Sequence, residues 1–124
     1  MNAIAASLHW ICLATGGWLT LNGVLHDIFV LASDHGKKYD RDLLRLLMDG
    51  HILITCGIVL MLCFPGLRSG QQFFFYIAAL CLVSIIGYCF MIWPFLKSIG
   101  TLVICTACLI AVVFTFFTTP TSHV

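Results

Sequence analysis

The sequence predicts an all-α integral membrane protein, a four-helix bundle whose four transmembrane helices run up, down, up and down. Of the 124 residues, 61% are hydrophobic and only 9% are charged, a composition far from that of a soluble domain. Four apolar segments each approach or exceed the roughly 20 residues that a helix needs to cross a bilayer. The breaks between them are short, so successive helices should be antiparallel neighbours.

The predicted spans belong to a single transmembrane domain, residues 1–124, and cover about residues 3–31, 43–64, 73–93 and 99–118. No positive segment precedes the first apolar stretch, so we expect it to be a retained membrane helix rather than a cleaved signal peptide. This span ends at the polar segment 33–38. The second ends at Pro65 and the third ends before Pro94, because proline favours turns at such positions.

The positive charges predict the orientation. Five of the six Lys and Arg residues flank the first and third loops, and only Arg68 lies on the opposite side. Positive residues are enriched in cytoplasmic loops. We therefore expect the first and third loops in the cytoplasm and both termini outside.

Small residues predict where the helices meet. Gly16, Thr20 and Gly23 share one stripe of the first span with Asp27, and small residues let membrane helices approach closely. The expected partner is one of two stripes on the second span, either His51 with Thr55 or Asp49 with Cys56. In the last span, helix packing is predicted through Ala107, Ala111 and Thr115, which recur every four residues. A second small stripe lies beside them and contains Thr101, Cys105 and Cys108.

Five polar residues in the first two spans form the candidate ligand-binding or ion-binding site: Asn22, His26, Asp27, Asp49 and His51. Ionisable groups inside a membrane are costly, so each of them suggests a function. Of the five ionisable residues inside the spans, all but His9 approach the same membrane face from two antiparallel helices. We therefore predict one connected cluster of His26, Asp27, Asp49 and His51.

Other arrangements of the same residues are open. Asp49 can pair with Arg45 four residues earlier, and Asp27 with Arg41 or Arg45, in purely structural ion pairs. His26 and His51 can supply two axial ligands to a single haem. A metal ion is harder to place, because adjacent His26 and Asp27 point about 100° apart on a helix. The identity of any metal stays unknown.

The seven cysteines all lie inside apolar stretches, where they are interpreted as small buried hydrophobic residues. Cys105 and Cys108 have the spacing of a redox dithiol, but a thiolate in the middle of a span would be costly. No disulfide framework is predicted.

Hydrolytic and phosphoryl-transfer motifs are absent from the chain, so no catalytic residue is assigned and an enzyme is not expected. The net charge of +1 excludes a strongly basic nucleic-acid surface. The leading hypothesis is a non-catalytic subunit or assembly component in the lipid bilayer, within a homo-oligomer or a larger membrane complex. The alternatives are an oligomeric ion-coupled or proton-coupled transporter or channel using the His/Asp cluster, and a haem-binding or metal-binding membrane subunit.

Overall fold

The computed structural model describes residues 3–119 and confirms the all-α four-helix architecture. Four long helices carry the fold: α1 (Ala3–Ala32), α2 (Arg41–Leu62), α4 (Gln72–Ile92) and α5 (Ile99–Thr118). Each long helix, α2 together with the short α3 (Phe64–Arg68), is long and apolar enough to cross a membrane. The chain is therefore a multi-pass integral membrane protein.

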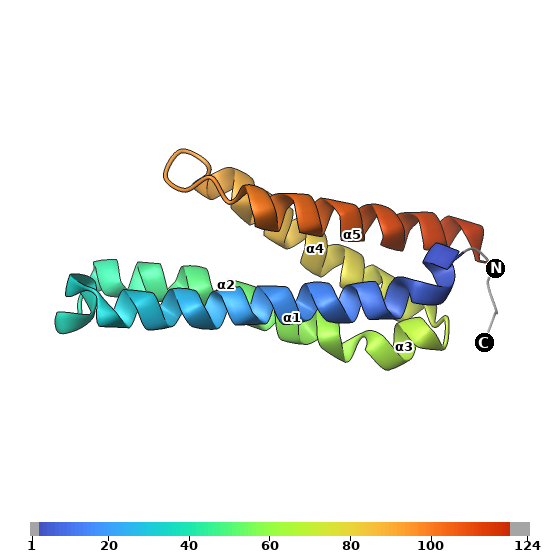
Figure 1. The fold of residues 1–124 in the computed structure, drawn as a ribbon, viewed down its shortest axis with the longest axis horizontal. Coiled ribbons are helices and arrows are strands. Elements are labelled where there is room, and N and C mark those ends of the chain that lie inside the picture. The colour runs from blue at the N-terminus through green and yellow to red at the C-terminus, as the bar shows by residue number, and fades with distance from the viewer. Residues whose placement is uncertain (1–2, 120–124) are drawn as a thin grey trace.

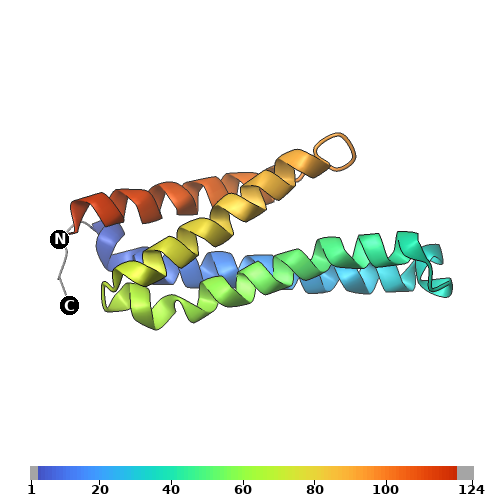
Figure 2. The ribbon, with the colours of Figure 1, turned by 180° about the vertical axis from the view of Figure 1, so that it is seen from behind.

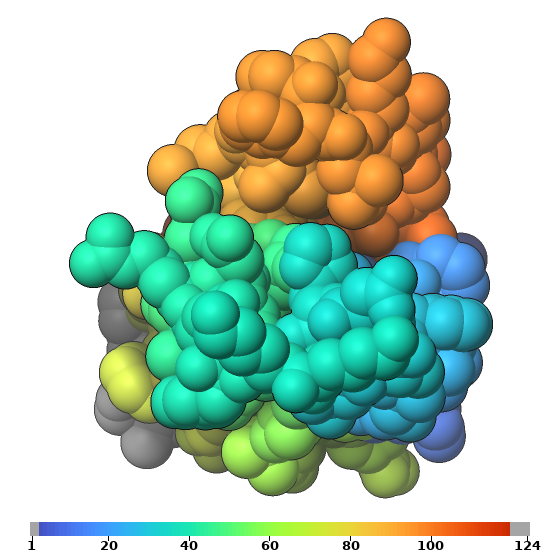
Figure 3. Space-filling model, turned by 90° about the vertical axis from the view of Figure 1, so that its left-hand side faces the viewer, coloured from blue at the N-terminus to red at the C-terminus, as the bar shows by residue number. Residues whose placement is uncertain are grey.

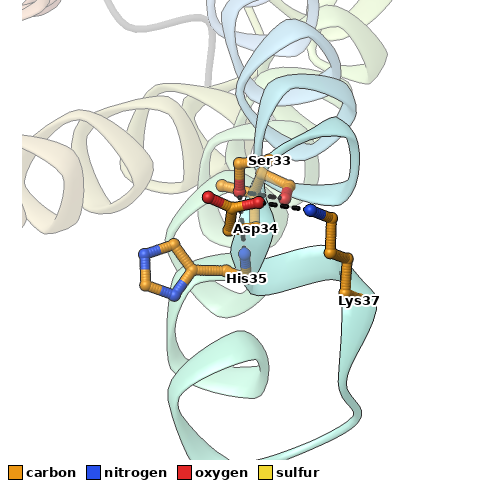
Figure 4. Close-up of polar contacts among 5 residues, drawn as sticks. Ser33, Asp34, His35 and Lys37 are labelled. Carbon is orange, nitrogen blue, oxygen red and sulfur yellow. Dashed lines mark hydrogen bonds and ion pairs between the residues drawn. The ribbon is translucent and has the colours of Figure 1, made fainter.

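The first loop contains a short 3₁₀ helix, η1 (Asp34–Lys37), which local hydrogen bonds hold in place. The Ser33 hydroxyl donates to the carbonyl of Val30 at 2.6 Å and accepts from the amide of His35 at 3.3 Å, and Lys37 pairs with Asp34 (Figure 4). The carboxylate of Asp40 then caps α2 by accepting from the amide of Leu43.

A short helix, α3, occupies residues that the sequence indicated as a loop. Pro65 lies in the first turn of this helix, where its missing amide hydrogen costs no intrahelical bond. The segment ends near Gly70, whose φ of +72° is accessible to glycine with little strain.

Glycine contacts bring α1 and α2 close together in the middle of the first hairpin. A Cβ added to Gly16 would lie 2.6 Å from the carbonyl oxygen of Gly57, and one added to Gly23 equally close to that of Gly50. These distances leave no room for a side chain. Each helix carries its pair of glycines seven residues apart, so the two antiparallel helices meet at matching levels.

The second hairpin, α4 with α5, packs on the first over only part of its length. The two hairpins are closest at the terminal end, where α1 begins and α5 ends (Figure 1). They diverge towards the η1 end, which holds η1 and the loop of residues 93–98 (Figure 2). The buried core between them includes Leu8, Cys12, Leu60, Leu82, Cys108 and Val112.

The hairpin of α1 and α2 projects beyond α5 at the η1 end. At 1.5 Å per residue, the 30 residues of α1 span about 45 Å, whereas the 20 residues of α5 span about 30 Å, the thickness of a hydrocarbon core. Because Cys12 of α1 contacts Cys108 of α5 and the two helices are antiparallel, the first residue of α5 lies level with Leu21. The rest of α1 extends further.

Candidate functional site

His26 and Asp27 lie in the projecting part of the first hairpin and touch each other. The Nδ1 atom of His26 is 3.4 Å from Oδ1 of Asp27, and their side chains are 29% and 23% exposed. The same Asp27 oxygen also packs directly against Gly50 of α2, in the place a side chain at that residue would need. Asp27 therefore belongs to the interface of α1 with α2.

Asp49 and His51 do not join this pair. Within residues 3–119, no hydrogen bond or ion pair links either of them to His26 or Asp27, so the connected cluster of four is not formed. The half-buried carboxylate of Asp49 lies beside the phenol of Tyr88 on α4, and His51 is exposed. Gly50, which separates them in sequence, is the residue that faces α1.

The alternative ion pairs with arginine are also absent from the described part of the chain. Its ion pairs are His26 with Asp27 and Lys37 with Asp34, and neither Arg41 nor Arg45 takes part in them. The arginine side chains are exposed at the η1 end.

Asn22 lies one helical turn before His26, one residue beyond the level at which α5 begins. Its side-chain amide donates a hydrogen bond of 2.8 Å to the carbonyl of Trp18 on its own helix. This bond uses one of the four hydrogen-bonding positions of the amide. The side chain is half-buried at the depth where the cover provided by α5 ends.

Haem or metal binding would need the candidate ligands to converge. His26 is directed at Asp27, whereas His51 is exposed on a different side of α2 from Gly50. Among residues 3–119, no group of three or more His, Cys, Asp or Glu side chains is arranged to hold a metal ion. The geometry therefore gives no support to either assignment.

The residues expected to pack helices occupy different environments. Gly16 and Gly23 contact α2, and the Thr20 hydroxyl lies against Gly57 while donating to the carbonyl of Gly16. On α5, Ala111 is half-buried and Ala107 is exposed. A spacing of four residues drifts by about 40° around a helix, so such a stripe turns out of the interface. The buried positions of α5 are the neighbouring small stripe of Thr101, Cys105 and Cys108, together with Val112 and Thr115.

The glycines of α2 and a pair of thiols were missed by the sequence interpretation. Gly50 and Gly57 are the partners of the α1 stripe, and their seven-residue spacing, repeated in Gly16 and Gly23, was the available signal. The thiols of Cys12 and Cys108 meet between the two hairpins at 3.7 Å. Nothing in their spacing along the chain indicated that contact.

The tip of the first hairpin, defined here as residues 24–48, exposes large apolar side chains beside its charged ones. They are Val24, Leu25, Ile28, Phe29, Leu31, Tyr39, Leu44 and Met48. Figure 3 looks onto this end and shows the tip and the loop between α4 and α5 as two masses with a recess between them. The tip thus receives little cover from the second hairpin.

Comparisons of the chain with models of protein families, with curated proteins and with solved structures find no match.

Proposed function

We propose that this protein is a non-catalytic component of a membrane assembly, and that a second copy or another membrane subunit packs against the tip of its first hairpin. The observation that carries the proposal is the apolar surface of the tip. Ile28, Phe29 and Leu31 lie beyond the level at which α5 begins, and each is more than half exposed. Exposed apolar patches of this kind are typical of interaction sites.

The thickness of the bilayer supports the same interpretation. A helix of about 45 Å that starts level with the other spans extends beyond a hydrocarbon core of about 30 Å at its far end. There, lipid tails cannot cover the apolar side chains fully. A protein partner that covers them would also surround His26 and Asp27, which are only partly buried within the chain.

The test is photo-crosslinking in native membranes with a benzophenone amino acid at Phe29, and at Phe117 as a matched control. Both residues are exposed phenylalanines, at 71% and 79%, but Phe117 lies on α5 at the terminal end. We expect a protein adduct from position 29 and lipid adducts from position 117. Mass spectrometry of the adduct then distinguishes a second copy from another subunit, and lipid adducts alone at both positions would refute the proposal.

Ion or proton coupling is a second candidate, favoured by the position of Asp49. This carboxylate is half-buried beside Tyr88, on the two helices that diverge towards the η1 end. Ionisable groups at such positions are typical of ion pathways. In vesicles containing the purified protein, this function predicts a cation or proton flux that Asp49→Asn abolishes. Equal fluxes in empty vesicles would exclude it.

For the orientation we propose cytoplasmic first and third loops. The test uses Lys37→Cys and Asn2→Cys in a background in which the half-exposed Cys56 and Cys81 are changed to serine. An impermeant thiol reagent added outside intact cells should label position 2 and spare position 37. The reverse pattern would invert the topology.

A further inference from the structure

Two buried thiols meet where the two hairpins pack against each other. The sulfur atoms of Cys12 on α1 and Cys108 on α5 are 3.7 Å apart, and the residues are 0% and 1% exposed. Among the side-chain hydrogen bonds of residues 3–119, this is the only one that joins two different helices, since every other partner lies within four residues along the chain. A hydrogen bond between two thiols is weak and adds little stability. The reactivity of the two thiols is therefore the more important property of this contact.

We propose that Cys12 and Cys108 are an oxidisable dithiol, a modification site that a hydroperoxide converts to a disulfide joining α1 to α5. The site is independent of the hairpin tip and of the assembly proposed above. Its sulfur atoms must approach from 3.7 Å to about 2 Å to form the bond. They belong to different hairpins, and both lie in the buried core between them.

The surroundings favour a disulfide over a metal complex. A disulfide is uncharged, whereas two thiolates on a monovalent soft metal ion carry a net negative charge, which an apolar interior disfavours strongly. In the described part of the chain, no third His, Cys, Asp or Glu completes a metal-binding group here. The apolar surroundings therefore favour the uncharged disulfide.

The location also selects the oxidant. Cys12 and Cys108 lie within the membrane-spanning helices and have almost no exposed surface. Glutathione and thiol-exchange enzymes are too polar or too large to reach them. Hydrogen peroxide is small enough to enter, and an oxidised lipid carries its hydroperoxide within the bilayer.

The reaction is balanced with one hydroperoxide. One sulfur attacks the terminal peroxide oxygen, the O–O bond breaks, and water or an alcohol leaves with the thiol proton, which gives a sulfenic acid. The second sulfur attacks the sulfenic sulfur, the S–O bond breaks, and water leaves. Two thiols thus lose two electrons, and the hydroperoxide is reduced to water and an alcohol, or to two waters.

The test is controlled oxidation of the folded full-length protein in lipid vesicles with hydrogen peroxide. We expect the protein to become lighter by two hydrogen atoms, with two of its seven thiols lost and a proteolytic peptide joining α1 to α5. Cys12→Ser and Cys108→Ser should each abolish this product. Cys89→Ser is the matched control, because Cys89 is equally buried and should leave the product unchanged.

A second pair of cysteines could form a disulfide in the same experiment and must be distinguished from the first. Cys56 of α2 and Cys81 of α4 also lie near each other between the hairpins and are less buried. A disulfide formed only between those two, or seven intact thiols under conditions that oxidise the unfolded chain, would overturn the proposal.

Discussion

The two hairpins use the same kind of residue in opposite ways. In the first, Gly16, Gly23, Gly50 and Gly57 lie against the backbone of the facing helix, with no space for another carbon atom. In the second, Gly87 and Gly100 face open space, and the helices pack through larger side chains such as Phe75, Leu82 and Ile85. A glycine in a membrane helix therefore indicates a close helix contact only where the backbone of a neighbouring helix lies against it.

The largest expected effect comes from adding bulk to the close contact. Gly16→Ala should lower the free energy of unfolding by about 2 kcal/mol, because its methyl group must displace the carbonyl of Gly57. Gly16→Leu and Gly23→Leu should prevent the hairpin from folding. Thermal unfolding in detergent measures both effects.

The adjacent Gly17 is the matched control for that experiment. A Cβ at Gly17 meets no atom within 4 Å, so Gly17→Ala should not lower the free energy of unfolding and should raise it by about 0.5 to 1 kcal/mol through helix propensity. Because Gly16 and Gly57 face each other, the double alanine variant should lose less stability than the sum of the single losses. Additive losses, or equal losses for Gly16→Ala and Gly17→Ala, would show that the contact does not hold the hairpin together.

An intermediate effect is expected from the two aspartates, which differ in what they touch. Asp27→Ala should lower the free energy of unfolding by about 1 kcal/mol, because it leaves a gap over Gly50 and removes the partner of His26. Asp49→Ala should have a smaller effect, since this carboxylate takes part in no ion pair among residues 3–119. Chemical unfolding of both variants in the same detergent provides the comparison.

A reversed order would change the assignment of these residues. If Asp49→Ala is the more destabilising variant, the contact with Tyr88 carries more of the fold than the contact of Asp27 with Gly50. If neither variant loses stability but both lose the protein crosslink that the wild-type chain forms at Phe29, the two carboxylates serve the assembly rather than the monomer.

The sequence was sufficient for the architecture because hydropathy and helix length are local properties. The long helices lie close to the predicted spans, and the confirmed fold class follows from them. The short helix of residues 64–68 was missed, because Pro65 and Gly66 favour a turn in the sequence. Only packing against other parts of the fold allows a helix there. The placement of Gly66 against the ring of Phe74 is a tertiary contact of this kind.

The polar site was harder to predict because it depends on helix rotation. A rotation of one residue, about 100°, decides whether Gly50 or His51 faces the first helix. Hydropathy does not determine that rotation, whereas the repeated seven-residue spacing of the glycines does. The contact of Cys12 with Cys108 depends further on how one hairpin docks on the other, and no local pattern contains that information.

The smallest expected effect is an increase in the free energy of unfolding from substitutions in the second hairpin. Gly87→Ala and Gly100→Ala place a methyl group where no atom lies within 4 Å, so they add no clash. Alanine restricts the unfolded backbone more than glycine does and favours the helix, so each variant should raise the free energy of unfolding by about 0.5 to 1 kcal/mol. The gain at Gly100 should be the smaller, because this residue lies in the first turn of α5, where helix propensity matters less. A loss of stability at Gly87 would reveal that an unseen partner approaches α4 as closely as α2 approaches α1, and the contrast between the hairpins would then belong to the isolated chain alone.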